Sequence, residues 1–456
     1  MRRTAFVAMV VDQLDEMVNS GILFGWEFKA ITKRNLQRLY SSPERCSLQS
    51  HQNRSVKEQS YKLYIYTLGE NDSVGCSTFQ LVEFRPIQEQ IDDAIELAAY
   101  SFNSVWELAE PPEILPPIVE TCDPKVRETP GPVVHSIEKR FVKAFADTDG
   151  CALNSVEIFI NFRSTSVFNS KGNAFLVERS DLYLEAAMEK VDSINDKEVH
   201  ENITSVTVED LEVEKFVERC SLQVSMLSTS EEPITNLNAF ILIGKQPLAE
   251  LFSSLTKQLA CAAEYFKYPH LKVGELVGGG NGDNLTLSVD PTIPRLAQSG
   301  AYTRDGLLSK AGSLIKDNMV VNRIVDNRYG QYLNLKPNGL MGNIIVKGGS
   351  LDDEKLQGIE YIEIIKFSSL LIDEKKLTWS SEIKLGKHIK PGHPDKLIKG
   401  GVVSGRLLDN LHDCFLSKKI STVNFPGDSY TPPLGYQGPD SALLMNGVSI
   451  SGKEIN

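Results

Sequence analysis

The longest regular pattern of apolar positions lies between Lys245 and Phe266. Its apolar residues recur at steps of three and four, which places them on one helix face: Leu248, Leu251, Phe252, Leu255, Leu259, Ala262, Ala263 and Phe266. Pro247 suits the first helical turn, and Tyr268-Pro269 disfavours continuation because the residue before a proline leaves the α region. The pattern predicts one amphipathic helix, preceded by a strand at Asn238 to Ile243.

Apolar spacing before this helix predicts a region of alternating strands and helices. We expect helices at residues 6–17, 87–109, 133–146, 181–191 and 208–226, with Thr207 and Asp210 as the cap of the last one. Strands are predicted at residues 26–31, 61–67, 75–84, 155–162 and 173–177. The polar residues 41–60 predict a long hairpin with a mobile tip. Asn169-Ser170-Lys171-Gly172 predicts a hairpin turn, for which a substrate-binding loop is the alternative.

The C-terminal half shows short apolar runs that are separated by turn signals. From Tyr361 onward these signals include Asp373-Glu374-Lys375 and Pro391-Gly392, a spacing that indicates a mainly antiparallel β-rich domain with a helix at Leu407 to Phe415. The glycine cluster Gly278 to Gly282 lacks the Gly-Lys-Ser/Thr ending of a phosphate-binding loop and precedes a predicted strand. We therefore interpret the cluster as a flexible loop.

The predicted fold class is α+β. An N-terminal α/β region of strands and amphipathic helices is followed by a mainly antiparallel β-rich C-terminal domain. Six prolines between Glu110 and Pro132 interrupt all periodicity, so a linker is predicted there. The predicted boundaries are 1–110 for an N-terminal α/β segment, 111–132 for the Pro-rich linker, 133–227 for a middle α/β segment and 228–456 for the C-terminal domain.

Composition and charge exclude several classes of partner. The net charge of -12 argues against a nucleic acid, which requires clustered lysine and arginine side chains. Seven scattered cysteines without a Cys-x-x-Cys pair indicate a reducing compartment. No apolar run approaches the roughly 20 residues of a membrane span. We expect a cytoplasmic protein that binds neither nucleic acid nor membrane.

The order of motifs around and after the helix resembles the carboxy-terminal half of the TldD/PmbA family. The resemblance is carried by Gly274-Glu275, Asp290-Pro291-Thr292, Asp305-Gly306, Val346 to Ser350 and Gly400 to Gly405. It covers roughly residues 150–456, and the first 110 residues only in outline. The family was formerly described as modulators of DNA gyrase and is now understood as peptidase subunits. One subunit, TldD, bears zinc, and its partner, TldE or PmbA, is metal-free.

The resemblance also implies where a zinc site would lie. In the zinc-bearing subunit this helix carries His-Glu-x-x-x-His, and an ungapped match through Gly274-Glu275 places those three positions at Glu250, Leu251 and Leu255. A cysteine that follows a Pro-Gly step completes the family's zinc site, but Pro426-Gly427 is followed here by Asp428-Ser429-Tyr430. The zinc ligands are therefore absent. We expect no metal or other cofactor, and we expect Leu251 and Leu255 to be buried.

Two other groups of residues were considered as sites. His388 and His393 are separated by Lys390-Pro391-Gly392, so they are interpreted as solvated loop residues rather than metal ligands. In His412-Asp413-Cys414, neighbouring residues of a helix point in different directions, so Cys414 is predicted to lie in the core. No catalytic, cofactor-binding or metal-binding residue is predicted, and the sequence does not identify the substrate-binding residues.

The function implied by the resemblance is that of a metal-free TldE/PmbA-like subunit. It would pair with a zinc-bearing TldD-like subunit to form a cytoplasmic peptidase for unfolded or leader-type peptides. We expect a heterodimer, or a homodimer in isolation, with the interface on the C-terminal domain. Two alternatives remain open. One is an independent hydrolase with a non-metal mechanism, and the other is a non-catalytic peptide-binding or scaffold protein.

Overall fold

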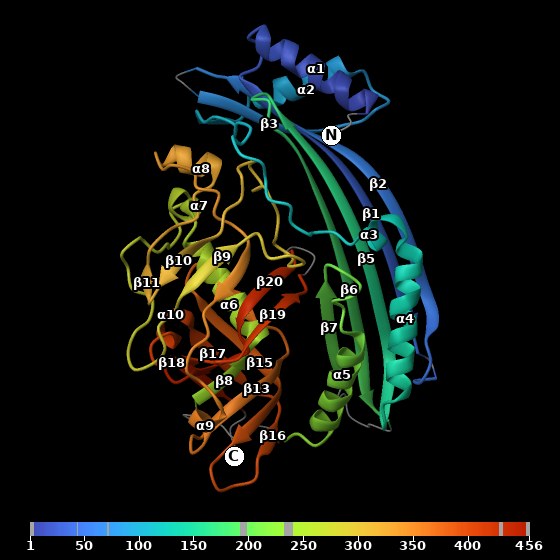
Figure 1. Ribbon diagram of the computed structural model, residues 1–456, viewed down its shortest axis with the longest axis vertical. Helices are drawn as coiled ribbons and strands as arrows, with labels where there is room; N and C mark the ends of the chain where they lie inside the picture. The colour runs from blue at the N-terminus through green and yellow to red at the C-terminus, as the bar shows by residue number, and fades with distance from the viewer. Residues whose placement is uncertain are drawn as a thin grey trace.

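The computed structural model describes residues 4–42, 44–70, 73–191, 198–231, 240–427 and 432–452. A long curved sheet runs along one side of the molecule, with two helices at its upper end and further helices beside it (Figure 1). A β-rich body, formed by the C-terminal half of the chain, lies next to this sheet. The fold is therefore α+β, as the sequence predicts.

The long sheet has the strand order β4-β3-β2-β1-β5-β6-β7 and is antiparallel throughout. Its strands are β1 (Gly25–Ser41), β2 (Gln49–Leu68), β3 (Ser73–Leu81), β4 (Phe102–Ser104), β5 (Cys151–Asn169), β6 (Ala174–Lys190) and β7 (Val199–Ser205). Because β1 pairs with both β2 and β5, the predicted segments 1–110 and 133–227 contribute to one sheet.

Several predicted elements of this region are wrong in type or extent. Residues 181–191 were predicted as a helix and are rich in Leu, Glu, Ala and Met, yet residues 181–190 continue strand β6 between β5 and β7. Pairing on both sides overrides the local helical preference. The hairpin predicted at residues 41–60 is present, since Ser41 of β1 pairs with Gln49 of β2, but most of the stretch is strand. The helix predicted at residues 87–109 ends at Ala98, and Phe102–Ser104 pair with β3 instead.

Five helices pack against the long sheet. Helices α1 (Ala5–Asn19) and α2 (Ile87–Ala98) share one apolar core with its upper end. Helices α3 (Pro124–Glu128), α4 (Pro130–Ala146) and α5 (Val213–Ser228) contribute to a second core with β5 and β6. Thr207 and Asp210 do not cap α5, because that helix begins six residues after Thr207 at Val213. They form a separate turn in which Thr207 Oγ1 accepts a hydrogen bond from the Asp210 backbone N–H at 3.3 Å.

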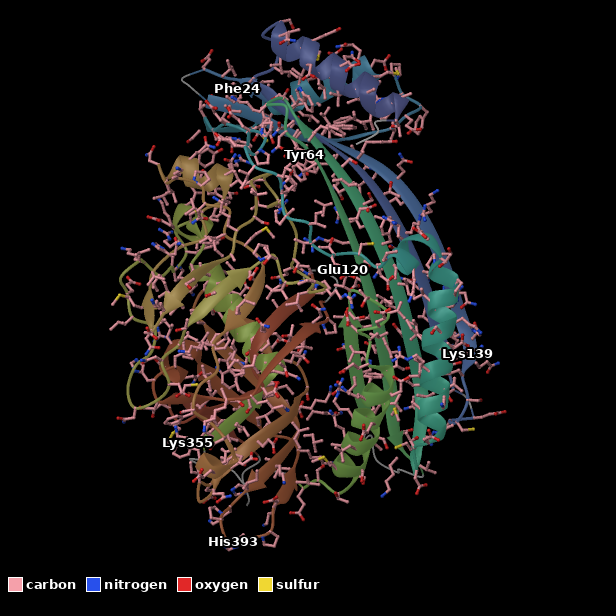
Figure 2. The ribbon with its side chains drawn as sticks, viewed as in Figure 1. Phe24, Tyr64, Glu120, Lys139, Lys355 and His393 are labelled. Carbon is pink, nitrogen blue, oxygen red and sulfur yellow. The ribbon has the colours of Figure 1, made fainter. Side chains whose placement is uncertain are left out.

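The predicted proline-rich linker is an extended segment attached to both parts of the molecule. Between β4 and α3 it forms neither helix nor strand. The Asn169 side chain donates to the Ala109 carbonyl at 2.8 Å, which fixes the segment to the long sheet. Arg295 Nε lies 2.8 Å from Glu120 Oε2, which fixes it to the C-terminal body. Glu120 accordingly lies between the two parts in Figure 2.

The C-terminal body contains two sheets with the strand orders β11-β10-β9-β12-β20-β19 and β18-β21-β8-β13-β15-β17-β22, while β14 and β16 pair with β15. The first sheet comprises β9 (Leu287–Asp290), β10 (Gly312–Lys316), β11 (Met319–Val320), β12 (Asn343–Val346), β19 (Ile420–Phe425) and β20 (Leu434–Pro439). The second comprises β8 (Phe240–Gly244), β13 (Tyr361–Phe367), β14 (Leu371–Asp373), β15 (Thr378–Ile389), β16 (Lys396–Ile398), β17 (Val402–Arg406), β18 (Cys414–Leu416), β21 (Ser441–Leu444) and β22 (Val448–Ser451). All pairings are antiparallel except β12 with β20 and β13 with β8.

Helix α6 (Lys245–Gln258) packs in a core that it shares with strands of both C-terminal sheets. The predicted helix is interrupted after α6, because Leu259 and Cys261 exchange backbone hydrogen bonds with Ile324, and α7 (Cys261–Tyr265) follows. The remaining helices are α8 (Asn327–Tyr332), α9 (Asp353–Leu356) and α10 (Leu407–Asn410). The helix predicted at 407–415 is therefore only its first turn, and Cys414 begins strand β18.

The glycine cluster is packed rather than free. Gly278 has a φ of 110°, and a Cβ there would lie 2.9 Å from the Leu411 carbonyl oxygen. A Cβ at Gly282 would lie closer still, 2.4 Å from the Cys414 carbonyl oxygen. The cluster therefore lets two backbone segments approach each other. In the described part of the chain, no helix is long and apolar enough to cross a membrane.

Candidate functional site

Helix α6 begins where strand β8 ends, at the edge of a cleft. Gly244 stands at the N-cap position and has no side chain with which to cap the helix. Pro247 lies in the first turn, where a missing N–H leaves no carbonyl without its partner. The predicted apolar face is buried at Leu248, Leu251, Phe252, Leu255 and Leu259. The first turn and the residues that follow it are therefore held rigidly by the core.

The three positions that correspond to the zinc motif lie in two environments. Leu251 and Leu255 are 1% and 0% exposed and belong to the main core of the C-terminal body. Glu250 is half-buried and lines the cleft instead. Leucine side chains have no donor atoms for a metal, so this helix does not fit zinc in the manner of the His-Glu-x-x-x-His motif.

The cleft lies between the long sheet and the C-terminal body and has a volume of about 610 Å³. One wall is formed by β7 and α5, and the other by the start of α6, the end of β13 and strand β19. In Figure 1 these elements face one another across the middle of the molecule. The cleft is thus built from segments that are more than 200 residues apart in the chain, from His200 to Pro426.

Two sheet edges border this cleft. Strand β7 is the last strand of the long sheet, and β19 is the last strand of the six-stranded sheet. Within the described residues, each is paired on one side only. An edge strand presents backbone N–H and C=O groups that an extended chain can pair with. The cleft is therefore bordered by two strands that each have one side without a strand partner among the described residues.

An ion pair joins the two walls of the cleft. Lys366 Nζ on β13 lies 2.7 Å from Glu201 Oε1 on β7, and Arg219 Nη2 on α5 lies 3.8 Å from Glu201 Oε2. The side chains of Lys366 and Glu201 are 21% and 13% exposed. Charges that are this poorly solvated interact more strongly than a surface pair.

Glu250 and Gln223 add two unusual polar groups to the same cleft. Burial raises the pKa of Glu250, and a hydrogen bond of 3.1 Å from Gln246 Nε2 opposes that shift. Gln223 on α5 is 5% exposed, and its Oε1 has no hydrogen-bond partner among the described residues. A buried acceptor without a donor is costly, so a ligand N–H that reached it would gain a hydrogen bond.

Among the described residues, no group of three or more His, Cys, Asp or Glu side chains is arranged to hold a metal ion. Pro426 lines the cleft. Asp428-Ser429-Tyr430, which replace the cysteine ligand, lie outside the described residues.

The other sequence candidates do not form a site. His388 lies on strand β15 rather than in a loop, and its Nε2 is 2.9 Å from Glu360 Oε1. His412 and Asp413 follow α10 and are not helical. The prediction that His412, Asp413 and Cys414 are neighbouring residues of one helix was therefore wrong. Cys414 is 3% exposed, as predicted, and burial raises the pKa of its thiol to about 12. Because the thiol stays protonated near neutral pH, it is an unreactive core residue.

The Asn-Ser-Lys-Gly turn is a hairpin turn between β5 and β6, as predicted. Asn169 Oδ1 accepts the backbone N–H groups of Lys171 and Asn173, both at 3.0 Å. Asn173 Nδ2 then donates to the Gly306 carbonyl at 2.9 Å. The turn therefore attaches the long sheet to the Asp305-Gly306 pair of the C-terminal body.

The polar residues of the cleft were not predicted from the sequence. Glu201, Gln223 and Lys366 lie on three different elements, and β7 itself was not predicted. The one available signal was the presence of the β-branched residues Val199, Ile203 and Thr204 in a polar stretch, which is weak in so short a strand.

Comparison with known proteins agrees with this fold. Residues 269–440 match the family model described as the PmbA/TldA metallopeptidase C-terminal domain. A comparison with curated protein sequences finds no match. The structure is similar to that of a proposed modulator of a DNA gyrase from Thermotoga maritima, with a TM-score of 0.78 and 13% identity over 97% of this chain and 100% of the other.

Two further solved structures are comparably similar. TldE from Thermococcus kodakarensis has a TM-score of 0.76 and 14% identity, over 96% of this chain and 100% of the other. A proposed modulator of DNA gyrase from Bacteroides thetaiotaomicron has the same TM-score and identity, over 99% of this chain and 100% of the other. At these identities the structural likeness shows the fold, which the three proteins share with this chain.

Proposed function

We propose that the chain is a metal-free, TldE-like subunit of a peptidase of the TldD/PmbA family, whose C-terminal domain model matches residues 269–440. Its partner is a zinc-bearing TldD-like subunit, and the complex acts in the cytoplasm on unfolded or leader-type peptides. The observation that supports this proposal most strongly is the environment of α6. Two of the three zinc-motif positions are leucines that are fully packed in the core, at Leu251 and Leu255.

The cleft supports a role in peptide binding. The edge strands β7 and β19 present backbone N–H and C=O groups to the cleft. A peptide that pairs with a strand edge is bound mainly through its backbone rather than its side chains. The unpaired Gln223 Oε1 provides an acceptor for a peptide N–H. A site of this kind accepts many sequences, provided that the substrate is extended.

The exposed apolar surface around α7 supports the proposal of a partner subunit. Phe266, Leu276 and Met319 are 49%, 67% and 45% exposed, and Leu276 pairs with Met319 through an isolated bridge. Phe266 also contacts Tyr265 and Tyr329, with ring centroids 5.2 Å and 5.1 Å apart. Subunit interfaces are enriched in such aromatic and apolar groups at their centres. We therefore place the interface with the TldD-like subunit on this part of the C-terminal body.

The test is reconstitution from separate subunits. The purified chain and its zinc-bearing relative are mixed at micromolar concentration and followed by size-exclusion chromatography, together with cleavage of an unstructured peptide. The proposal requires a complex that cleaves faster than either subunit alone. Separate elution with full activity of the relative alone would contradict it. Robust cleavage by this chain after chelator treatment would favour an independent hydrolase.

A further inference from the structure

A second candidate site lies at the opposite end of α6 from the cleft. A pocket of about 500 Å³ is lined by the end of α6 and by His270, Lys375, Lys376 and Arg406. None of the residues that line it is acidic. Lys375, Lys376 and Arg406 thus place three cationic side chains in one pocket of a chain whose net charge is -12. They produce a local positive potential that attracts anions.

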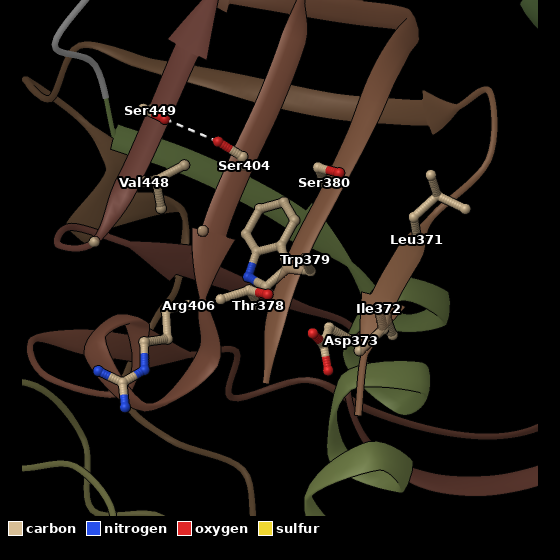
Figure 3. Close-up of a pocket in the computed structure, with 12 residues that line it drawn as sticks. Leu371, Ile372, Asp373, Thr378, Trp379, Ser380, Ser404, Arg406, Val448 and Ser449 are labelled. Atoms are coloured by element: carbon tan, nitrogen blue, oxygen red, sulfur yellow. Dashed lines mark hydrogen bonds between the residues drawn. The ribbon is translucent and has the colours of Figure 1, made fainter. Parts of the chain in front are cut away.

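The basic pocket continues into a strip of hydroxyl groups. A neighbouring hollow of about 750 Å³ shares Thr378 and Arg406 with it and crosses strands β14, β15, β17 and β22. Ser380, Ser404 and Ser449 stand opposite one another on three adjacent strands, and the hydroxyls of Ser404 and Ser449 are 2.9 Å apart (Figure 3). The two hollows therefore form one open groove with a cationic end and a hydroxyl-lined end.

The carboxylates at the groove already have partners, including Asp373, which itself lines the larger hollow. Asp373 Oδ1 accepts the backbone N–H groups of Lys375 and Lys376, at 2.9 Å and 3.1 Å. Glu374 is paired with Lys257 on α6, and Asp409 Oδ1 lies 3.7 Å from Arg406 Nη1. Glu382 on the serine-bearing face lies outside the lining and accepts a hydrogen bond from Ser368.

Lys375 and Lys376, at the cationic end, form no ion pair with a carboxylate within the described residues. The turn that carries them is attached to α6 by Gln258 Nε2, which donates to the carbonyls of Glu374 and Lys375 at 2.9 Å. The Lys375 ammonium lies 4.2 Å from the centroid of the Tyr268 ring. The Lys376 ammonium makes no hydrogen bond or ion pair within the described residues. Both lysines are exposed and free to meet a ligand.

We propose that this groove binds an extended acidic peptide segment. Aspartate or glutamate side chains of the ligand would lie against Lys375, Lys376 and Arg406, and its backbone would bond to the serine hydroxyls. A single phosphate would use the cationic end and leave the serine strip unused. The groove and the cleft lie at opposite ends of α6, so the two proposals can fail independently.

The test uses fluorescence anisotropy with the full chain and a labelled unstructured peptide of alternating glutamate and serine. A peptide with glutamine in place of glutamate and free inorganic phosphate serve as competitors. The charge-reversal variant Lys375→Glu/Lys376→Glu should weaken binding about tenfold or more. The matched control Lys139→Glu/Lys143→Glu changes the same number of exposed charges on α4, where Lys139 points away from the C-terminal body (Figure 2). It should leave affinity within about twofold.

Further outcomes separate the ligand classes. The affinity for the acidic peptide should fall steeply as salt is added, because the contacts are screened. Ser404→Ala/Ser449→Ala should weaken binding of the peptide without changing the weak binding of phosphate. Equal binding of the glutamine peptide would overturn the proposal, as would an unchanged affinity in the lysine variant. Competition by inorganic phosphate at the concentration of the peptide would show a small-anion site instead.

Discussion

Lys366 and Glu201 join the two halves of the molecule across the cleft, with Lys366 Nζ 2.7 Å from Glu201 Oε1. Lys366 belongs to the nine-stranded sheet of the C-terminal body, and Glu201 belongs to the edge strand of the long sheet. The pair therefore attaches β7, one of the strand edges that border the proposed peptide site, to the C-terminal body. Its removal tests whether the cleft is held by this contact.

Replacement of Lys366 by methionine should destabilise the fold by about 1–3 kcal/mol, because Glu201 would remain poorly solvated with only the more distant Arg219. Urea denaturation measures this change. Lys139→Met is the control, since its side chain lies on the exposed surface of α4 and should have little effect. Equal stability of the two variants would show that the pair does not hold the cleft.

Leu255→Ala should cost about 2–5 kcal/mol, because it removes a fully buried side chain from the main core. Leu222→Ala on α5 provides the comparison, since that side chain is 60% exposed. Both free energies of unfolding can be measured with the same denaturant series. A loss well under 1 kcal/mol at Leu255 would mean that this face of α6 is not packed as described.

These two sites differ in how far the sequence could predict them. The face of α6 follows from a local repeat of three and four residues, so Leu251 and Leu255 were placed correctly. The Lys366–Glu201 pair joins residues that are 165 positions apart, and no local pattern links them. The helix predicted in place of the end of strand β6 was wrong for a related reason. Its Leu-Glu-Ala-Ala-Met run favours a helix, and only pairing with two neighbouring strands makes it extended.

The pH dependence of stability should contain a contribution from His200 and Glu185. His200 Nε2 lies 3.0 Å from Glu185 Oε1, and this hydrogen bond raises the pKa of the imidazole. Burial tends to raise the pKa of Glu185, but its hydrogen bonds to His200 and Tyr183 outweigh burial and lower it. A raised histidine pKa stabilises the fold fully below the unfolded value of about 6.5 and loses that contribution as pH rises through the folded value.

The contribution of the Glu185 carboxylate to the stability of the fold depends on pH in the opposite sense. A lowered pKa of Glu185 stabilises the fold above the unfolded value of about 4.3, and the contribution is lost as pH falls through the folded value. The stability difference between the native chain and His200→Gln should therefore be largest in mildly acidic solution and shrink above neutrality. In Glu185→Gln, an NMR titration should give a lower pKa for His200. An unchanged His200 pKa in that variant would show that the contact is not maintained in solution.

The proposed partner surface predicts a selective loss of assembly. Phe266→Ser/Leu276→Ser should weaken association with the TldD-like subunit, because both side chains are exposed and apolar. The fold should be preserved, which circular dichroism and denaturation would check. Leu222→Ser on α5 is the matched control and should assemble normally. If all variants assemble alike, the interface lies elsewhere.

The purified chain should contain no stoichiometric zinc at neutral pH, because Leu251 and Leu255 have no metal donor atoms. Elemental analysis after gel filtration measures the metal content. A chelator should then abolish cleavage by the complex, and activity should return when zinc is restored to the TldD-like subunit before mixing. One tightly bound zinc per copy of this chain would contradict the assignment.

The central claim concerns which subunit performs the chemistry, and inactivation of one subunit at a time in the assembled complex tests it most directly. The measured quantity is the single-turnover rate of peptide cleavage. Replacement of the glutamate in the partner's His-Glu-x-x-x-His motif should abolish cleavage. Glu250→Gln in this chain should leave the chemical step unchanged, although peptide affinity can shift because Glu250 lines the cleft. Cleavage that persists without the partner's glutamate and is lost with Glu250→Gln would contradict the account.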